Sequence, residues 1–235
     1  MTAGIDIATN LQLVQARVAG AAERAGRDPK EITIIGVCKT MPIQVIRTAV
    51  LAGVCDLGEN RVQEAKEKFG SGRPPGVTLH LIGHLQTNKA RQAVQLFDVV
   101  HSVDSERIAE ALHREAERVG IVLPVLIEVN VAGEESKQGV ASADVADAVR
   151  WIVARASLRL AGLMTVAPEA PSAEDLRPVF RELRELRETH CPSGFNGAPL
   201  ALSMGMSNDF EVAIEEGATH VRVGRAIFGA RPQPA

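Results

Sequence analysis

The chain has 235 residues, of which 46% are hydrophobic, and this length suits one globular domain over residues 1–235. Its formal net charge is −3, and its basic residues alternate with acidic ones instead of forming a stripe, which argues against a nucleic-acid partner. The opening residues lack a signal-peptide pattern, the apolar runs are too short to cross a bilayer and the three cysteines are far apart, so we expect a cytoplasmic protein with no membrane contact and no metal site.

Apolar, β-rich runs alternate with helical patterns after an opening amphipathic helix at 6–26. The predicted strands are residues 32–39, 54–58, 77–83, 97–103, 124–131, 159–166, 199–204 and 220–224. The predicted helices between them cover 42–53, 60–70, 87–97, 104–120, 143–156, 172–190 and 207–218. Strand and helix thus alternate eight times, which favours an α/β fold, a single (β/α)8 TIM barrel with an extra N-terminal helix. An open doubly wound sheet is the alternative.

Lys39 ends the first predicted strand, I-T-I-I-G-V-C-K. Period-two alternation places it on the same face as Ile35 and Val37. Barrels of this kind carry their working residues at the carboxyl ends of strands, and a partly desolvated lysine there has its neutral amine favoured. Imine formation with an aldehyde requires that neutral amine. The alternative is a lysine whose ammonium group simply reaches solvent at the rim.

Arg222 lies in the last predicted strand, where Val221 and Val223 would face the helices and Arg222 the barrel interior. A buried guanidinium needs an acceptor. A pyridine nitrogen would serve, and an arginine there would keep that nitrogen unprotonated and the ring a poor electron sink, which favours holding a cofactor over carbanion chemistry. The alternative is an internal ion pair with Glu128 or Asp56.

Small and hydroxyl residues follow the last two predicted strands, in L-S-M-G-M-S and V-G-R-A-I-F-G. Phosphate sites in this fold are commonly built from these two loops. Ser203, Gly205, Ser207, Gly224 and Arg225 together predict such a site. Taken singly, each is an ordinary turn with a helix cap, which is the better interpretation of Ser207 or Asn208.

Four further residues have weaker signals. His80 and His84 lie four residues apart at a strand end without a third ligand at suitable spacing, so they are interpreted as core or rim histidines and not as metal ligands. Asn60 follows the second predicted strand, where it would cap a helix or contact a ligand. Lys137, on the loop A-G-E-E-S-K-Q-G, is either a surface lysine or a second amine that exchanges an aldehyde at the rim.

Seven segments in fixed order carry a resemblance to a known family: V-C-K-T-M-P (37–42), L-G-E-N-R-V-Q-E (57–64), H-L-I-G-H-L-Q-T-N-K (80–89), H-S-V-D (101–104), V-N-V-A-G-E-E-S-K-Q-G (129–139), G-L-M-T-V (162–166) and the run 202–229. From end to end the chain resembles the pyridoxal phosphate homeostasis protein family, whose barrel is similar to the N-terminal domain of alanine racemase.

The resemblance implies that the chain binds pyridoxal 5′-phosphate (PLP) as a covalent aldimine on Lys39, with Arg222 at the ring nitrogen. It also implies a set of phosphate-binding residues, namely Ser203, Gly205, Gly224 and their neighbours. Positions implied to border the ring are Asn60, His84 and Met164. Position 225, usually threonine or serine in the family, is arginine here, so a direct charge contact would replace a hydroxyl contact to the phosphate. The serine usual before the lysine is Cys38.

The resemblance implies PLP homeostasis: reversible binding, control of free PLP and supply to PLP-dependent apo-enzymes. The chain has no tyrosine, so a phenol cannot serve as acid or base within the subunit, and no catalytic residue is assigned. Whether it is also an enzyme stays open. The alternatives are a low-activity PLP-dependent racemase or lyase, a Schiff-base aldolase on a phosphorylated sugar, and a scaffold protein. A monomer is expected.

Overall fold

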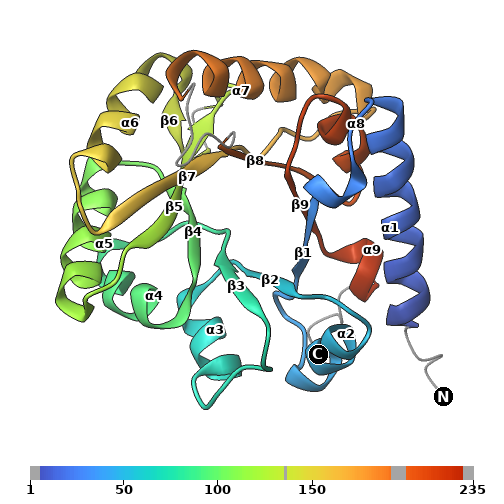
Figure 1. Cartoon of the computed structure of the whole chain (residues 1–235), viewed down its shortest axis with the longest axis horizontal. Helices are drawn as coiled ribbons and strands as arrows, with labels where there is room; N and C mark the ends of the chain where they lie inside the picture. The colour runs from blue at the N-terminus through green and yellow to red at the C-terminus, as the bar shows by residue number, and fades with distance from the viewer. Residues whose placement is uncertain (1–5, 135–136, 192–199, 230–235) are drawn as a thin grey trace.

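Parallel strands close into a barrel with helices around it (Figure 1), in a computed structural model that describes residues 6–134, 137–191 and 200–229. The strands are β1 Thr33–Val37, β2 Asp56–Glu59, β3 Thr78–Leu81, β4 Val99–Val103, β5 Leu123–Asn130, β6 Val140–Ala141, β7 Leu158–Met164, β8 Ala201–Met206 and β9 His220–Val223. The helices are α1 Ile7–Arg24, α2 Ile43–Leu51, α3 Val62–Phe69, α4 Ala90–Leu96, α5 Glu106–Val119, α6 Val145–Val153, α7 Arg177–His190, α8 Phe210–Glu215 and α9 Arg225–Phe228.

The barrel closes through the pairing of β4 with β5. The strand order is β4-β3-β2-β1-β9-β8-β7-β5, and the β4–β5 pair joins its two ends. All of these pairs are parallel. The predicted (β/α)8 barrel is therefore confirmed, and the open sheet is wrong.

The eight predicted strands all occur, although residue 199, the first of the seventh, lies outside the described residues. Two short elements were not predicted, namely β6, which pairs with the end of β5, and α9, which follows β9. Both are too short to show a period in sequence. No helix in the described parts of the chain is long and apolar enough to span a membrane.

Helix α1 is the extra N-terminal helix. The side chain of Asp6 caps it by accepting a hydrogen bond from the Thr9 N–H at 3.0 Å. Its buried residues recur at helical spacing: Ile7, Leu11, Val14, Val18, Ala21 and Ala22. This face lies against α8 and α9, the elements that follow the last two barrel strands (Figure 1). The helix therefore supports the loops where the phosphate site is predicted.

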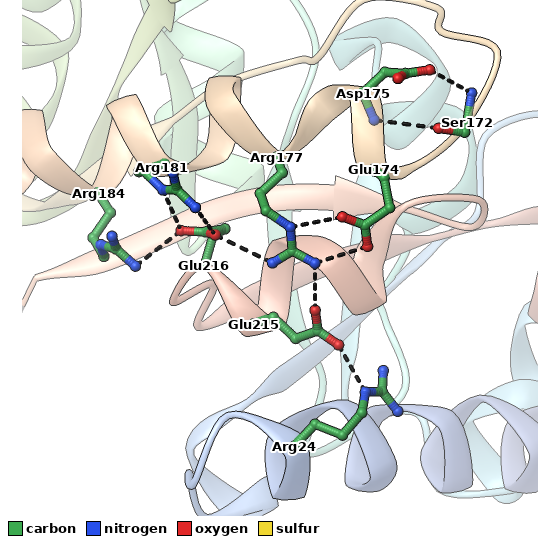
Figure 2. Close-up of polar contacts among 9 residues, drawn as sticks. All are labelled: Arg24, Ser172, Glu174, Asp175, Arg177, Arg181, Arg184, Glu215 and Glu216. Carbon is green, nitrogen blue, oxygen red and sulfur yellow. Dashed lines mark hydrogen bonds and ion pairs between the residues drawn. The ribbon is translucent and has the colours of Figure 1, made fainter.

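An ion-pair network joins α8 to α7 and α1 (Figure 2). Glu216 lies directly after α8. Its carboxylate oxygens lie 3.2 Å from a guanidinium nitrogen of Arg177, 3.0 Å from one of Arg181 and 3.0 Å from one of Arg184. Neighbouring Glu215 pairs with Arg177 and with Arg24 of α1. Burial raises the pKa of Glu216, but hydrogen bonds from Arg181 and Arg177 outweigh burial, so the pKa is lowered. The network therefore fixes α8 at its carboxyl end.

Replacing Glu216 with glutamine is expected to destabilise the protein by about 2 kcal/mol at neutral pH, because it removes the buried anion on which these arginines converge. Chemical denaturation of the variant and the wild type measures the difference. Since the pKa of Glu216 is lowered, its stabilising contribution is present above its ordinary pKa and is lost as pH falls through the folded value. The difference between the two proteins should thus shrink in acid, and a difference that stays constant would contradict this account.

Candidate functional site

Lys39 lies in the turn after β1, not at the last position of the strand as predicted, because β1 ends at Val37. Its side chain is half-buried. Thr40, which follows, has a φ of 65° and is the only non-glycine residue with positive φ among those described. Such a backbone is costly for a β-branched residue. The lysine-bearing turn is therefore held in a conformation that Thr40 does not favour by itself.

An ion cluster behind the turn holds this backbone on both sides of Lys39. The ammonium group of Lys68, on α3, donates to the Cys38 carbonyl oxygen at 2.7 Å, to Glu59 Oε1 at 2.7 Å and to Glu64 Oε1 at 2.6 Å. The same Glu64 oxygen accepts a hydrogen bond from the Thr40 N–H. Lys68 thus fixes the residue before Lys39 directly and the residue after it through Glu64.

In this cluster, burial and ion pairing shift the pKa values in opposite directions. Burial lowers the pKa of Lys68, but its hydrogen bonds to Glu59 and Glu64 outweigh burial, so the pKa is raised and the ammonium form is favoured. Glu59 is fully buried, and burial raises the pKa of its carboxyl despite the contact with Lys68. The cluster therefore depends on Lys68, since Glu59 would be a buried carboxyl without a cation if Lys68 were lost.

Arg222 faces the barrel interior, as predicted, and is 4% exposed. Its Nη1 donates to the Ser203 carbonyl oxygen at 2.7 Å and to Ser203 Oγ at 2.8 Å, and its Nη2 donates to the Thr165 carbonyl oxygen at 2.7 Å. Burial lowers the pKa of Arg222 to about 10, while Glu128 and Asp209 act in the opposite direction. The group therefore remains a cation at neutral pH.

The alternative ion pair of Arg222 with Glu128 or Asp56 is not formed among the residues that the structure describes. A guanidinium carries five N–H groups, and three hydrogen bonds from Arg222 are found. Two N–H groups therefore have no acceptor in the described part of the chain, although the side chain is buried. A ligand with a lone pair, such as a ring nitrogen, fits this arrangement.

Glu128, on β5, is a buried carboxyl beside the same region. It lies in register with Met164 at the end of β7 and is 7% exposed. Its Oε2 is buried and has no hydrogen-bond partner among the described residues. Burial and, to a smaller extent, Asp104 raise its pKa to about 7 against the opposing effect of Arg222. This carboxyl can therefore hold a proton near neutral pH.

The structure gives Gly205 a packing role. It has a φ of 90°, and a Cβ there would lie 2.7 Å from the Ala213 Cβ and 2.8 Å from the Phe210 Cα, both on α8. Only glycine allows α8 to approach the strand so closely. This packing explains the glycine at position 205 without the predicted close approach to a ligand.

The turns after β8 and β9 meet at the predicted phosphate site. Ser207 Oγ accepts a hydrogen bond from the Ala226 N–H at 3.4 Å, which joins the two turns. Gly224 is the N-cap of α9, and its neighbour Arg225 is exposed. Asp209, not Ser207, is the N-cap of α8, so the capping interpretation of Ser207 is wrong. Both turns present small or polar residues at the rim of the barrel.

The other predicted site residues lie at different depths. Met164 is fully buried as the last residue of β7, and half-buried Asn60 follows β2. Arg61 is the N-cap of α3 and makes no side-chain cap bond, so the capping alternative for Asn60 is wrong. His84 is exposed and its Nδ1 lies 3.0 Å from Asp104 Oδ2. It lines a cavity of about 620 Å³ together with Lys137, which pairs with Glu134 at 3.0 Å.

His80 and His84 do not share a site, because β3 ends between them and only His80 enters the barrel. His80 is a core histidine and His84 a rim histidine, as interpreted from sequence. No cluster of three metal-ligating side chains occurs in the described ranges. Sequence reasoning missed Lys68, Glu59 and Glu64 as supports of Lys39, and no period or motif marks them for that role.

These features define a class: a barrel like that of alanine racemase, with a lysine after the first strand and a buried arginine in the last. Residues 9–232 match the family model described as "Alanine racemase, N-terminal domain". The chain is 42% identical to the pyridoxal phosphate homeostasis protein of Aquifex aeolicus, over 94% of this chain and 96% of that one. The corresponding protein of Escherichia coli K12 is 40% identical, over 96% and 97%.

A solved structure agrees with these relatives. PipY of Synechococcus elongatus with PLP bound is 35% identical and superposes with a TM-score of 0.74, over 90% of this chain and 100% of that one. The same protein without PLP superposes with a TM-score of 0.78. The chain belongs to the pyridoxal phosphate homeostasis protein family.

Proposed function

We propose that this protein binds PLP reversibly through a Schiff base on Lys39, and thereby helps to control the level of free PLP and its supply to other proteins. Two features on neighbouring strands carry the proposal: half-buried Lys39 follows β1, and buried Arg222 on β9 retains unpaired N–H groups. The PLP-bound structure of a 35% identical relative supports it.

Each group has a definite task in this proposal. The Lys39 amine adds to the aldehyde carbon of PLP, and a C=N bond forms as water leaves. Arg222 donates to the ring nitrogen and keeps it unprotonated. The phosphate lies at the turns after β8 and β9, beside Gly224 and Arg225. Ser203 and Gly205, which were predicted with them, lie within β8, and the Ser203 hydroxyl bonds to Arg222 and His101. Asn60, His84 and Met164 border the ring.

Replacing Lys39 with alanine is expected to abolish the absorbance band of bound PLP, because the amine that forms the imine is absent. Purified wild type and variant are each incubated with PLP, reduced with borohydride and mapped by peptide mass spectrometry. Lys137→Ala is the matched control, since Lys137 is the lysine that lines the neighbouring rim cavity. A reduced adduct on Lys137, or a band that persists in Lys39→Ala, would contradict the assignment.

Homeostasis requires that bound PLP leave again. The PLP-loaded protein, mixed with a PLP-dependent apo-enzyme, should activate that enzyme as PLP is released, and PLP-dependent apo-enzymes are the proposed receivers. The loaded protein alone should show no substantial amino-acid turnover in a coupled D-amino-acid assay, since the chain has no tyrosine to act as a second acid or base. Substantial racemase turnover would favour the enzyme alternative instead.

A further inference from the structure

A column of hydrogen-bonded polar side chains crosses the interior of the barrel. His80 Nε2 lies 2.9 Å from Asp56 Oδ1, and His80 Nδ1 lies 2.9 Å from His101 Nε2. His101 Nδ1 lies 3.0 Å from Ser203 Oγ, which accepts a hydrogen bond from Arg222 at 2.8 Å. Both imidazoles, Ser203 and Arg222 are buried in the barrel core. Five side chains from β2, β3, β4, β8 and β9 therefore form one continuous chain of contacts.

The two ends of the column differ in exposure. Asp56 is the first residue of β2, and its side chain is 26% exposed. Arg222 is the third of four residues in β9, two positions before Gly224. Asp56 and Arg222 are both in register with Ile35, on the two strands that flank β1. A partly exposed charge at Asp56 is thus linked to the buried charge of Arg222.

The hydrogen bonds of the column have one consistent direction. Ser203 Oγ accepts from Arg222, so its own hydrogen can be donated to His101 Nδ1. A neutral His101 then carries its proton on Nε2 and donates to His80 Nδ1, and His80 donates from Nε2 to the Asp56 carboxylate. The reverse assignment would place protons on both nitrogens of His80, a second buried cation near Arg222.

The surroundings of the column agree with a neutral His101. His220 packs edge-on against both rings, with centroid distances of 6.4 Å to His80 and 6.2 Å to His101, and its Nδ1 bonds to Thr219 instead of joining the column. Burial lowers the pKa of His101 well below its ordinary value, and His80, His220 and Arg222 lower it further. The His101 ring therefore stays uncharged between Ser203 and His80.

We propose that Asp56, His80 and His101 are positioning residues for Ser203 and Arg222, and that they form a relay through which the charge of Asp56 fixes the hydrogen-bond direction at the cofactor site. With the relay intact, the Ser203 hydroxyl donates a hydrogen bond to His101 and accepts one from Arg222. The guanidinium is then held in one orientation, with its unpaired N–H groups left for the ligand. The function of the relay depends on the proposed PLP site, whereas its hydrogen bonds are present without PLP.

The decisive measurement is made on the protein without PLP. Long-range proton–nitrogen NMR spectra of the imidazole rings are expected to show both His80 and His101 protonated on Nε2 only. Asp56→Asn keeps the shape of the side chain but removes its charge, so either tautomer of His80 becomes acceptable. We expect the variant to perturb the ring signals of His80 and His101 and the guanidinium signal of Arg222. A proton on Nδ1 of either ring, or a perturbation confined to His80, would overturn the relay.

Asp98→Asn is the matched control. Asp98 directly precedes β4 and pairs with Arg73, but it does not touch the column. Asp56→Asn should weaken PLP binding about fivefold while Asp98→Asn leaves it unchanged, since only the former loosens Arg222. Equal affinities of the two variants would contradict a link to the site. If the wild type failed to bind PLP, the proposed function would be wrong, whereas the spectra of the PLP-free protein would still decide whether the relay exists.

Discussion

Replacing Lys68 with methionine is expected to destabilise the protein by about 3 kcal/mol and to slow covalent capture of PLP by Lys39 about tenfold. The loss of stability follows from Glu59, a fully buried carboxyl whose cation is Lys68. Removing one partner of a buried pair costs about 3–5 kcal/mol, and the raised pKa of Glu59 lets it take up a proton, which limits the cost to the lower end. Denaturant unfolding measures this part.

The slower capture follows from the backbone around Lys39. Without Lys68, the Cys38 carbonyl loses its donor and Glu64 loses the cation that holds it against the Thr40 N–H. The positive φ of Thr40 then relaxes, and leaving that conformation gains about 1–2 kcal/mol. The fraction of molecules with Lys39 in place therefore falls by about tenfold. Stopped-flow absorbance at a fixed PLP concentration measures the capture rate.

Lys66→Met is the matched control, because Lys66 is an exposed lysine on the same helix. Lys66→Met should change neither the free energy of unfolding nor the rate of PLP capture. Thr40→Gly combined with Lys68→Met should restore part of the capture rate without restoring stability, since glycine adopts positive φ at no steric cost. A Lys68→Met protein that captures PLP at the wild-type rate would show that the cluster serves folding alone.

The barrel was predictable because its signal is local and repeated. Each strand is a short apolar run bounded by turn residues, and a run such as I-T-I-I-G-V-C-K identifies its strand without knowledge of any partner. The two-residue strand β6 and the four-residue helix α9 show no period and went unpredicted. The boundary after Val37 was also missed, since the hydrogen bonds that end β1 come from α3 and not from the strand itself.

Lys39 and Arg222 were predictable as candidate site residues because a charge at a strand end or inside a barrel conflicts with its surroundings. The residues that support them were not. In the sequence, Lys68 is one of several charged residues on an amphipathic helix, and Asp56 is a polar residue at the start of a strand. Their roles arise from contacts between elements 20 or more residues apart, such as His80 with His101, for which a single sequence holds no signal.

Replacing Glu128 with glutamine is expected to stabilise the protein by about 3 kcal/mol at pH above 8 and to leave its stability nearly unchanged near pH 4.5. The pKa of Glu128 is raised from 4.5 to about 7 because burial disfavours the carboxylate. A raised carboxyl pKa means that the folded state holds its proton more tightly than the unfolded state does. The resulting stability is fully present below the ordinary pKa and is lost as pH rises through about 7. A difference of about 2.5 pKa units corresponds to about 3 kcal/mol.

The difference between variant and wild type isolates this group. Burial lowers the pKa of His220 to about 4 and also lowers that of His101, so these histidines reduce stability as pH falls below about 6.5, with the opposite slope. Both proteins share that loss, and it cancels in the comparison. Glu117→Gln, at an exposed position of α5, is the control and should show no pH-dependent difference. If the free energy of unfolding of Glu128→Gln stayed parallel to that of the wild type between pH 4.5 and 8.5, the Glu128 carboxyl would have to be ionised throughout, and its buried Oε2 would require a partner that the described residues do not supply.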